Sequence, residues 1–109
     1  EDISALSKAA EAVTVDEEIK KYIISIVRET RKKNKYIEYG ASPRASIGIM
    51  KCVRITAMLE NRKWVLPEDV KELAGDILRH RIIRSFEAEA DGIDSDAVIK
   101  TILGTVKTP

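Results

Sequence analysis

At 109 residues the chain has room for one domain with one hydrophobic core, and not for two. Hydrophobic residues make up 44% of the sequence, charged residues 34% and aromatic residues 5%, which excludes a disordered tail and favours a helical core of Ile, Val, Leu and Ala. The net charge of +1 excludes a strongly basic or acidic protein, and no apolar run approaches the roughly 20 residues that cross a bilayer.

The first third of the chain predicts one short and one long helix. Residues 3–12 are Ala-rich and compatible with a short helix, which the β-branched residues near Val13 interrupt. Asp16 is a good N-cap for the long helix, which has acids in its first turn and the bases Arg31 to Lys33 at its end. Its apolar face is expected to contain Ile19, Tyr22, Ile23, Ile26 and Val27.

A loop over residues 34–40 is expected to lead into a second long helix. Ser42 is the predicted N-cap and Pro43 the first helical residue, where the missing N–H costs nothing. Gly48 lies inside this helix, and Asn61 is a plausible left-handed stop after it. The predicted buried stripe consists of Ile47, Met50, Val53, Ala57 and Met58.

The last third predicts two further helices and some extended chain. Residues 63–66 are extended in character, and Pro67 opens a helix whose apolar face contains Val70, Leu73, Ala74, Ile77 and Leu78. After an acidic loop, Asp94 or Ser95 caps a final helix with Val98, Ile99, Ile102 and Leu103 inside. Short β-type pieces around Val13, Val65 and Ile82 suggest a small sheet. The predicted fold is therefore mainly α, a bundle of four to five helices with short β pieces.

Charge is distributed unevenly along the chain. We call the five bases between residues 28 and 35 the basic cluster: Arg28, Arg31, Lys32, Lys33 and Lys35. We call the five acids between residues 87 and 96 the acidic cluster: Glu87, Glu89, Asp91, Asp94 and Asp96. Each cluster is compatible with a solvated surface or with a docking surface for another domain or subunit.

The familiar catalytic patterns are missing from the sequence. It contains no Gly-rich phosphate loop, and its single His and single Cys do not make a zinc site, so no metal is expected. Cys52 and His80 could formally be a nucleophilic pair. Cys52 borders an apolar helix stripe and His80 lies near a helix end, so structural positions explain both residues more simply. The single Cys also excludes an internal disulfide and favours a reducing, cytoplasmic compartment.

Arg44 is the unusual residue of the sequence. A cation in the first turn of a helix faces the positive end of the helix dipole, which costs roughly 0.3–1 kcal/mol. The same end offers free N–H groups, so an arginine there concentrates positive charge and hydrogen-bond donors that suit a phosphate. An arginine lying over the surface, or paired with an acid, is the alternative interpretation. The residues alone do not choose between the two.

Three ordered motifs resemble the MoxR family of AAA+ ATPases. Residues 40–45, Gly-Ala-Ser-Pro-Arg-Ala, are similar to the family's sensor-2 signature. Residues 61–70 resemble its Gly-Arg-x-aromatic-Val-x-Pro-x-Asp-Val block, and residues 77–82 its Val-Leu-Arg-His-Arg run. Asn61 and Leu66 depart from the family pattern, where a glycine and a Ser or Thr cap are usual. The resemblance covers nearly the whole chain.

The resemblance implies that residues 1–109 are a single domain, the C-terminal helical lid that follows an α/β ATPase core, with residues 1–15 leading in from that core. It implies that Arg44 is the sensor-2 arginine that contacts ATP and assists hydrolysis, with Ser42 and Ala45 beside the nucleotide. ATP and Mg²⁺ would be bound mainly by the core, so the chain alone is not expected to be an enzyme or to bind a cofactor.

The family also implies partners. These are the chain's own core domain, neighbouring subunits of a ring that is commonly a homo-hexamer, and proteins with von Willebrand factor A domains. Family members are chaperone-like remodelling ATPases. The alternatives are a protein-docking module that uses the two charged clusters, or a nucleic-acid-binding module that uses the basic cluster with Arg79, Arg81 and Arg84. The near-zero net charge disfavours nucleic acid as a partner, and no membrane is expected.

Overall fold

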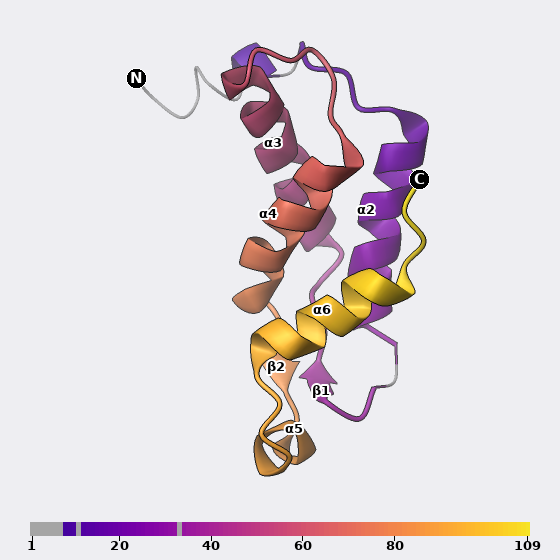
Figure 1. The fold of residues 1–109 in the computed structure, drawn as a ribbon, viewed down its shortest axis with the longest axis vertical. Helices are drawn as coiled ribbons and strands as arrows, with labels where there is room; N and C mark the ends of the chain where they lie inside the picture. Colours follow the sequence, from indigo (N-terminus) through magenta and orange to yellow (C-terminus); the bar gives the residue numbers. More distant parts are fainter. Residues whose placement is uncertain (1–7, 11, 33) are drawn as a thin grey trace.

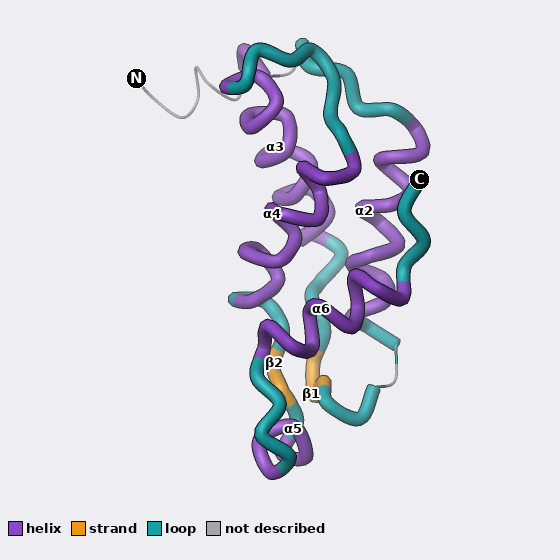
Figure 2. Tube along the Cα trace, in the orientation of Figure 1, coloured by secondary structure: helices purple, strands orange, loops and turns teal. Residues whose placement is uncertain are grey.

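Four helices enclose the hydrophobic core, and each packs against two others. The pairs in contact are α2 with α3, α3 with α4, α4 with α6, and α6 with α2 (Figure 1). A two-stranded sheet and the short α5 lie beyond this bundle, at one end of a molecule that measures 44 × 30 × 21 Å (Figure 2). The computed structural model describes residues 8–10, 12–32 and 34–109. Its elements are α2 (Glu17–Thr30), β1 (Ile37–Tyr39), α3 (Arg44–Leu59), α4 (Pro67–Arg79), β2 (Ile83–Arg84), α5 (Phe86–Ala90) and α6 (Ser95–Thr105).

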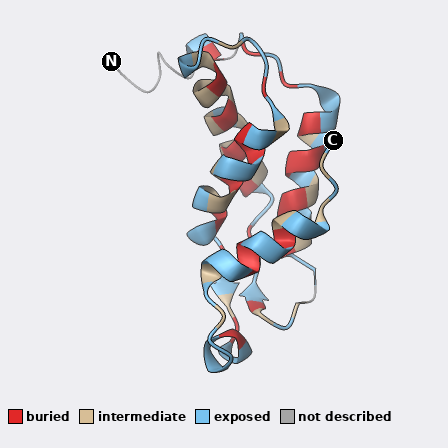
Figure 3. Cartoon of the chain, in the orientation of Figure 1, coloured by how far each residue is buried: buried red, intermediate tan, exposed pale blue. Residues whose placement is uncertain are grey.

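The caps predicted for α2 and α6, the start of α4 at Pro67 and the apolar faces of all three helices are confirmed. The Asp16 carboxylate accepts from the Glu18 N–H at 3.0 Å, and the Asp94 carboxylate accepts from the Ala97 N–H at 2.8 Å. Buried residues line the inner sides of these helices (Figure 3). All five apolar residues predicted for α2 are buried, whereas Leu73, Ile77 and Leu103 are partly buried at the edge of the core.

The predicted stripe of α3 is partly wrong. Its buried residues follow a strict spacing of four: Ala45, Ile49, Val53 and Ala57. Ile47 is 58% exposed, and the core position belongs to Ile49. Both sides of this helix carry large apolar residues, so the 3.6-residue period alone does not identify the inner side.

The extended segments pair in two separate places. Thr14 forms a parallel bridge with Trp64, which joins the predicted pieces near Val13 and Val65. The piece near Ile82 pairs elsewhere, because β2 is antiparallel to β1, with Tyr39 opposite Ile83. The prediction of a loop over residues 34–40 is therefore wrong at Ile37–Tyr39, where a partner more than 40 residues away induces a strand.

The acidic loop predicted before α6 contains α5, which was not predicted. Ser85 caps it by accepting from the Ala88 N–H at 3.1 Å, and its hydroxyl donates to the Lys35 carbonyl at 2.6 Å. Only residues 8–10 and 12 of the predicted first helix lie within the described range, and residues 8–10 are helical. None of the described helices is long and apolar enough to span a membrane.

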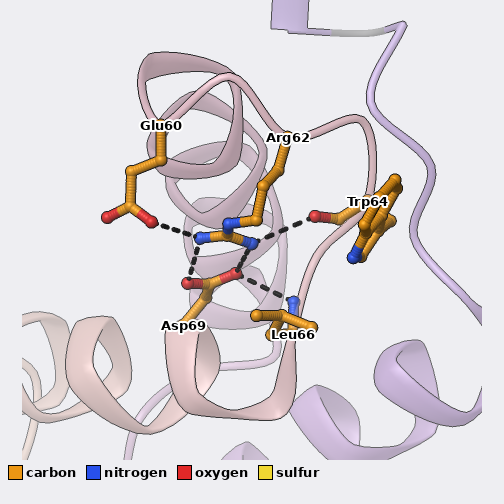
Figure 4. Close-up of polar contacts among 5 residues, drawn as sticks. All are labelled: Glu60, Arg62, Trp64, Leu66 and Asp69. Carbon is orange, nitrogen blue, oxygen red and sulfur yellow. Dashed lines mark hydrogen bonds and ion pairs between the residues drawn. The ribbon is translucent and has the colours of Figure 1, made fainter.

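An arginine–aspartate pair fixes the turn between α3 and α4 (Figure 4). Asn61 adopts the predicted left-handed conformation, with φ of 61°. Arg62 then donates two hydrogen bonds to Asp69, both 2.8 Å, and others to Glu60 and the Trp64 carbonyl. Leu66 cannot cap α4 with its side chain, but its N–H donates to Asp69 at 2.8 Å. Asp69 thus supplies one half of a capping box.

Burial raises the pKa of Asp69, but the hydrogen bonds from Arg62 and from the Leu66 N–H outweigh it, so this pKa lies below its ordinary value. A carboxyl whose pKa falls on folding stabilises the native state above its unfolded pKa of about 3.9, and that stability is lost as the pH falls through the lower folded value. The pair therefore holds the turn at neutral pH and weakens in acid.

Replacement of Asp69 by Asn should lower the free energy of unfolding at neutral pH by about 1–3 kcal/mol, because a buried charged hydrogen-bond acceptor is lost. The difference from the parent chain should shrink below about pH 4, measured by urea denaturation across pH. Glu60→Gln is the matched control: it contacts the same arginine from an exposed position, and the change should stay within about 0.5 kcal/mol. A pH-independent deficit in Asp69→Asn would contradict this account.

Candidate functional site

Arg44 is the first residue of α3 and its side chain is exposed. Each of the other described helices from α2 onward has acids in its first turn, whereas α3 has none. No side chain caps α3. Within the described part of the chain, Arg44 has neither an ion pair nor a side-chain hydrogen bond. The positive end of this helix and its arginine therefore face solvent without a compensating acid.

The prediction that Ser42 caps α3 is wrong. Pro43 occupies the cap position with helical dihedrals, φ −56° and ψ −23°, so the helical turn already begins at a residue without a side-chain acceptor. Ser42 contributes its carbonyl, which accepts from the Ala45 N–H at 2.9 Å. Ser42 and Arg44 are exposed, whereas the Ala45 side chain is buried in the core. Of the three predicted nucleotide-binding residues, two therefore present side chains to solvent.

The loop that carries this motif is held against the end of α2. Thr30, the last residue of α2, is fully buried, and its hydroxyl accepts from the Ala41 N–H at 3.0 Å. Arg31 donates to the Ala41 carbonyl at 3.3 Å. Both backbone polar groups of Ala41, three residues before Arg44, are thus paired with side chains at the end of α2, those of Thr30 and of the C-cap Arg31.

Gly40 is the residue that permits this approach. A Cβ added at Gly40 would lie 2.1 Å from the Thr30 carbonyl oxygen and 2.5 Å from its carbon. Both atoms belong to the backbone, so relief would require the loop or the end of α2 to move. Only glycine fits here, which explains the first residue of the sensor-2-like motif.

A cavity of about 190 Å³ lies between α2 and the start of α3. Its lining comes from the last part of α2 with its C-cap Arg31 and from two residues that flank Arg44: Ile24, Val27, Arg28, Arg31, Pro43 and Ser46. The cavity therefore combines two basic side chains, Arg28 and Arg31, with apolar ones, and it lies beside the motif that contains Arg44. Sequence reasoning assigned Arg28 and Arg31 to a charged surface but did not connect them with the start of α3.

Most of the remaining bases proposed for nucleic-acid binding are paired with acids. Lys32 contacts Glu29 at 3.1 Å, Arg79 contacts Asp96 at 2.7 Å, and Arg84 contacts Glu89 at 3.5 Å. Hydrogen bonds to Asp96 and then to Asp76 raise the pKa of Arg79 above its usual range. Lys33 lies outside the described residues. Paired bases release fewer counterions on a polyanion, so these contacts weigh against the nucleic-acid alternative.

The acidic cluster is also used within the fold. Asp91 accepts from the Tyr36 hydroxyl at 2.9 Å, and Asp94 caps α6. Together with the pairs of Glu89 and Asp96 above, these contacts join residues 35–36, α4, β2, α5 and α6. Most acids of this cluster are therefore already paired within the fold, which weighs against the interpretation that they form a docking surface.

The alternative chemistry at Cys52 and His80 finds no geometric support. Cys52 is half-buried on α3, and His80 is the exposed C-cap of α4. No hydrogen bond joins them among those of the described residues. The same residues contain no group of three or more His, Cys, Asp or Glu side chains that could hold a metal.

A family model described as an AAA lid domain matches residues 28–102. The chain belongs to the AAA lid domain family. This match includes the end of α2, the motif around Arg44 and most of α6. The predicted helical bundle is therefore confirmed as a lid fold.

Relatives place this AAA lid domain with MoxR-like ATPases, as the three motifs indicate. It is 38% identical to the uncharacterized protein YeaC of Bacillus subtilis, over all of this chain and 34% of YeaC. It is 35% identical to the chaperone MoxR1 of Mycobacterium tuberculosis, over 99% of this chain and 31% of MoxR1. A crystal structure provisionally assigned as an ATPase from Cytophaga hutchinsonii superposes with a TM-score of 0.86 at 43% identity, covering 94% of this chain and 33% of that one. The chain thus spans about one third of the length of these proteins.

Two glycines of the lid provide a matched test of the site geometry. Gly40→Ala should lower the free energy of unfolding by about 1–3 kcal/mol, because two backbone segments must separate. Gly48→Ala in the middle of α3 should raise it by about 0.5–1 kcal/mol, since alanine favours the helix and nothing lies within 4 Å of the added Cβ. Urea denaturation of both variants measures the contrast. Equal effects at the two positions would contradict the close approach at Gly40.

Proposed function

We propose that this lid supplies Arg44 as the sensor-2 arginine of an ATP site whose other groups belong to an AAA+ core domain. The observation that carries the proposal is an exposed arginine at the uncapped positive end of α3, with no acid partner among the described residues. Such an end attracts an anion, and a guanidinium offers a planar pair of donors to a phosphate.

The residues fit one part of a nucleotide site and not the whole. Arg44 and the first turn of α3 offer donors and positive charge, which suit a phosphate. The described residues offer no cluster of ligands for Mg²⁺, so we assign the metal to the core domain together with most ATP contacts. The bound Mg²⁺ would supply charge neutralisation at the phosphates.

Arg44 then has two tasks in this proposal. Its guanidinium hydrogen-bonds the terminal phosphate, so the position of the lid depends on whether that phosphate is present. During hydrolysis the same charge stabilises the negative charge on the phosphate oxygens as the terminal group leaves. The core domain can be that of the same chain or of a neighbouring subunit.

Ring assembly and the remodelling of client proteins complete the proposal. The name of MoxR1, a chaperone, supports a chaperone-like activity for the longer protein. We extend this to assembly as a ring, with the lid between neighbouring core domains, and to partners with von Willebrand factor A domains. We place the protein in the cytoplasm.

Replacement of Arg44 by Ala in the full-length protein should lower kcat for ATP hydrolysis by about 100-fold, because one donor to the developing charge is removed. Arg81→Ala is the matched control, since Arg81 is also exposed but follows α4, outside the sensor-2-like residues 40–45. Its turnover should stay near that of the unaltered protein. Unchanged turnover in Arg44→Ala would remove the sensor role.

The isolated 109-residue chain should bind ATP no more tightly than a Kd of about 1 mM, which corresponds to −4.1 kcal/mol. The reason is that one arginine and one helix end make only part of a nucleotide site. Isothermal titration calorimetry with Mg-ATP measures this affinity. Saturable binding in the micromolar range would show that the lid holds far more of the site than we propose.

A further inference from the structure

Thr30 is a polar residue at a fully buried position. Its hydroxyl donates to the Val27 carbonyl at 2.6 Å, within α2, and accepts from the Ala41 N–H at 3.0 Å. Valine has the same shape and would fill the same space without a polar group to desolvate. Valine could make neither hydrogen bond, and of the two only the bond to the Ala41 N–H joins α2 to the loop.

The hydrogen bond from Ala41 to Thr30 restrains Arg44 because the backbone between Ala41 and Arg44 is short and has little freedom. Ala41 is buried and bonded at both its N–H and its carbonyl, and Gly40 lies against the Thr30 backbone. Between Ala41 and Arg44 stand Ser42 and Pro43, and the proline ring fixes one of the backbone angles. From the other side, Ala45 is buried in the core. The backbone of Arg44 is thus held on both sides, and Thr30 is the anchor on the α2 side.

We infer that Thr30 is a positioning residue for Arg44: its buried hydroxyl sets where the arginine stands relative to α2. The inference rests on the proposed sensor function of Arg44. Thr30 itself has no route to a nucleotide, because it is covered completely. Its effect on hydrolysis would pass only through the loop and Arg44.

The position of Arg44 matters because the rate of hydrolysis depends steeply on where a catalytic charge lies. A misplacement of about 1 Å in a charged group can cost as much as 100-fold in rate, even when the substituted residue is remote from the chemistry. In Thr30→Val the Ala41 N–H loses its acceptor in a buried place, which favours movement of the loop towards other partners or water. Thr30→Ser keeps the acceptor and is the conservative control.

The test is a double-mutant cycle on ATP hydrolysis by the full-length protein, with Thr30→Val, Thr30→Ser, Arg44→Ala and the double variant Thr30→Val/Arg44→Ala. Thr30→Val should lower kcat by about 10- to 100-fold with KM near that of the unaltered protein. Thr30→Ser should restore most of the rate. In the Arg44→Ala background, Thr30→Val should cause no further loss, because the group that it positions is gone.

The outcomes separate this inference from the proposed function. If Arg44→Ala leaves turnover unchanged, the sensor role itself fails. If Arg44→Ala lowers turnover but Thr30→Val does not, or lowers it equally in both backgrounds, the sensor role stands and Thr30 is only a structural residue. Melting curves establish that each variant is folded at the assay temperature. Should Thr30→Val not fold, Thr30→Ala replaces it in the same cycle, since it also removes the hydroxyl that accepts from the Ala41 N–H, and the same outcomes apply.

Discussion

The end of α2 and the loop before α3 meet backbone against backbone, and the placement of Arg44 depends on this contact. A Cβ added at Gly40 would lie only 2.1 Å from the Thr30 carbonyl oxygen, so no side chain fits there. The Thr30 hydroxyl and the Arg31 guanidinium then pair both polar groups of Ala41. Because α3 starts three residues later and packs on both α2 and α4, this contact also sets the first corner of the helix bundle.

The N-termini of the described helices from α2 onward divide into two kinds. Those of α2, α4, α5 and α6 have acids in the first turn, which oppose the positive end of the helix dipole. That of α3 carries an arginine and no cap. Arg44 is unfavourable for the stability of α3, and the loop before it is held in one conformation. This combination is expected where a residue is selected for function and not for stability.

Local signals predicted much of this fold. Asp16 and Asp94 marked two helix starts, and Pro67 a third, because caps and proline act within a few residues of their position. Non-local contacts explain the failures. β1 exists through its pairing with β2, and α5 is tied through Ser85 to Lys35, 50 residues earlier. The inner side of α3 was misassigned at Ile47 because the exposed side of this helix also carries large apolar residues, Ile47 and Leu59.

The candidate site was only partly visible in the sequence. Arg44 stood out because its charge opposes the helix dipole, and the family motif gave it a role. The role of Thr30 was not visible in the sequence, because a threonine at a helix end gives no sign that its hydroxyl accepts from Ala41, 11 residues away. Arg62 and Asp69 both lie in the motif of residues 61–70, but only the fold shows that they pair across the start of α4.

The most direct test of the account is a crystal or cryo-electron-microscopy structure of the full-length protein with Mg²⁺ and a non-hydrolysable ATP analogue. We expect the Arg44 guanidinium to lie within hydrogen-bond distance of a terminal phosphate oxygen, about 2.7–2.9 Å. We also expect the Thr30–Ala41 hydrogen bond to be kept in that state. A phosphate site fully formed by other residues, with Arg44 turned to solvent in every subunit, would contradict it.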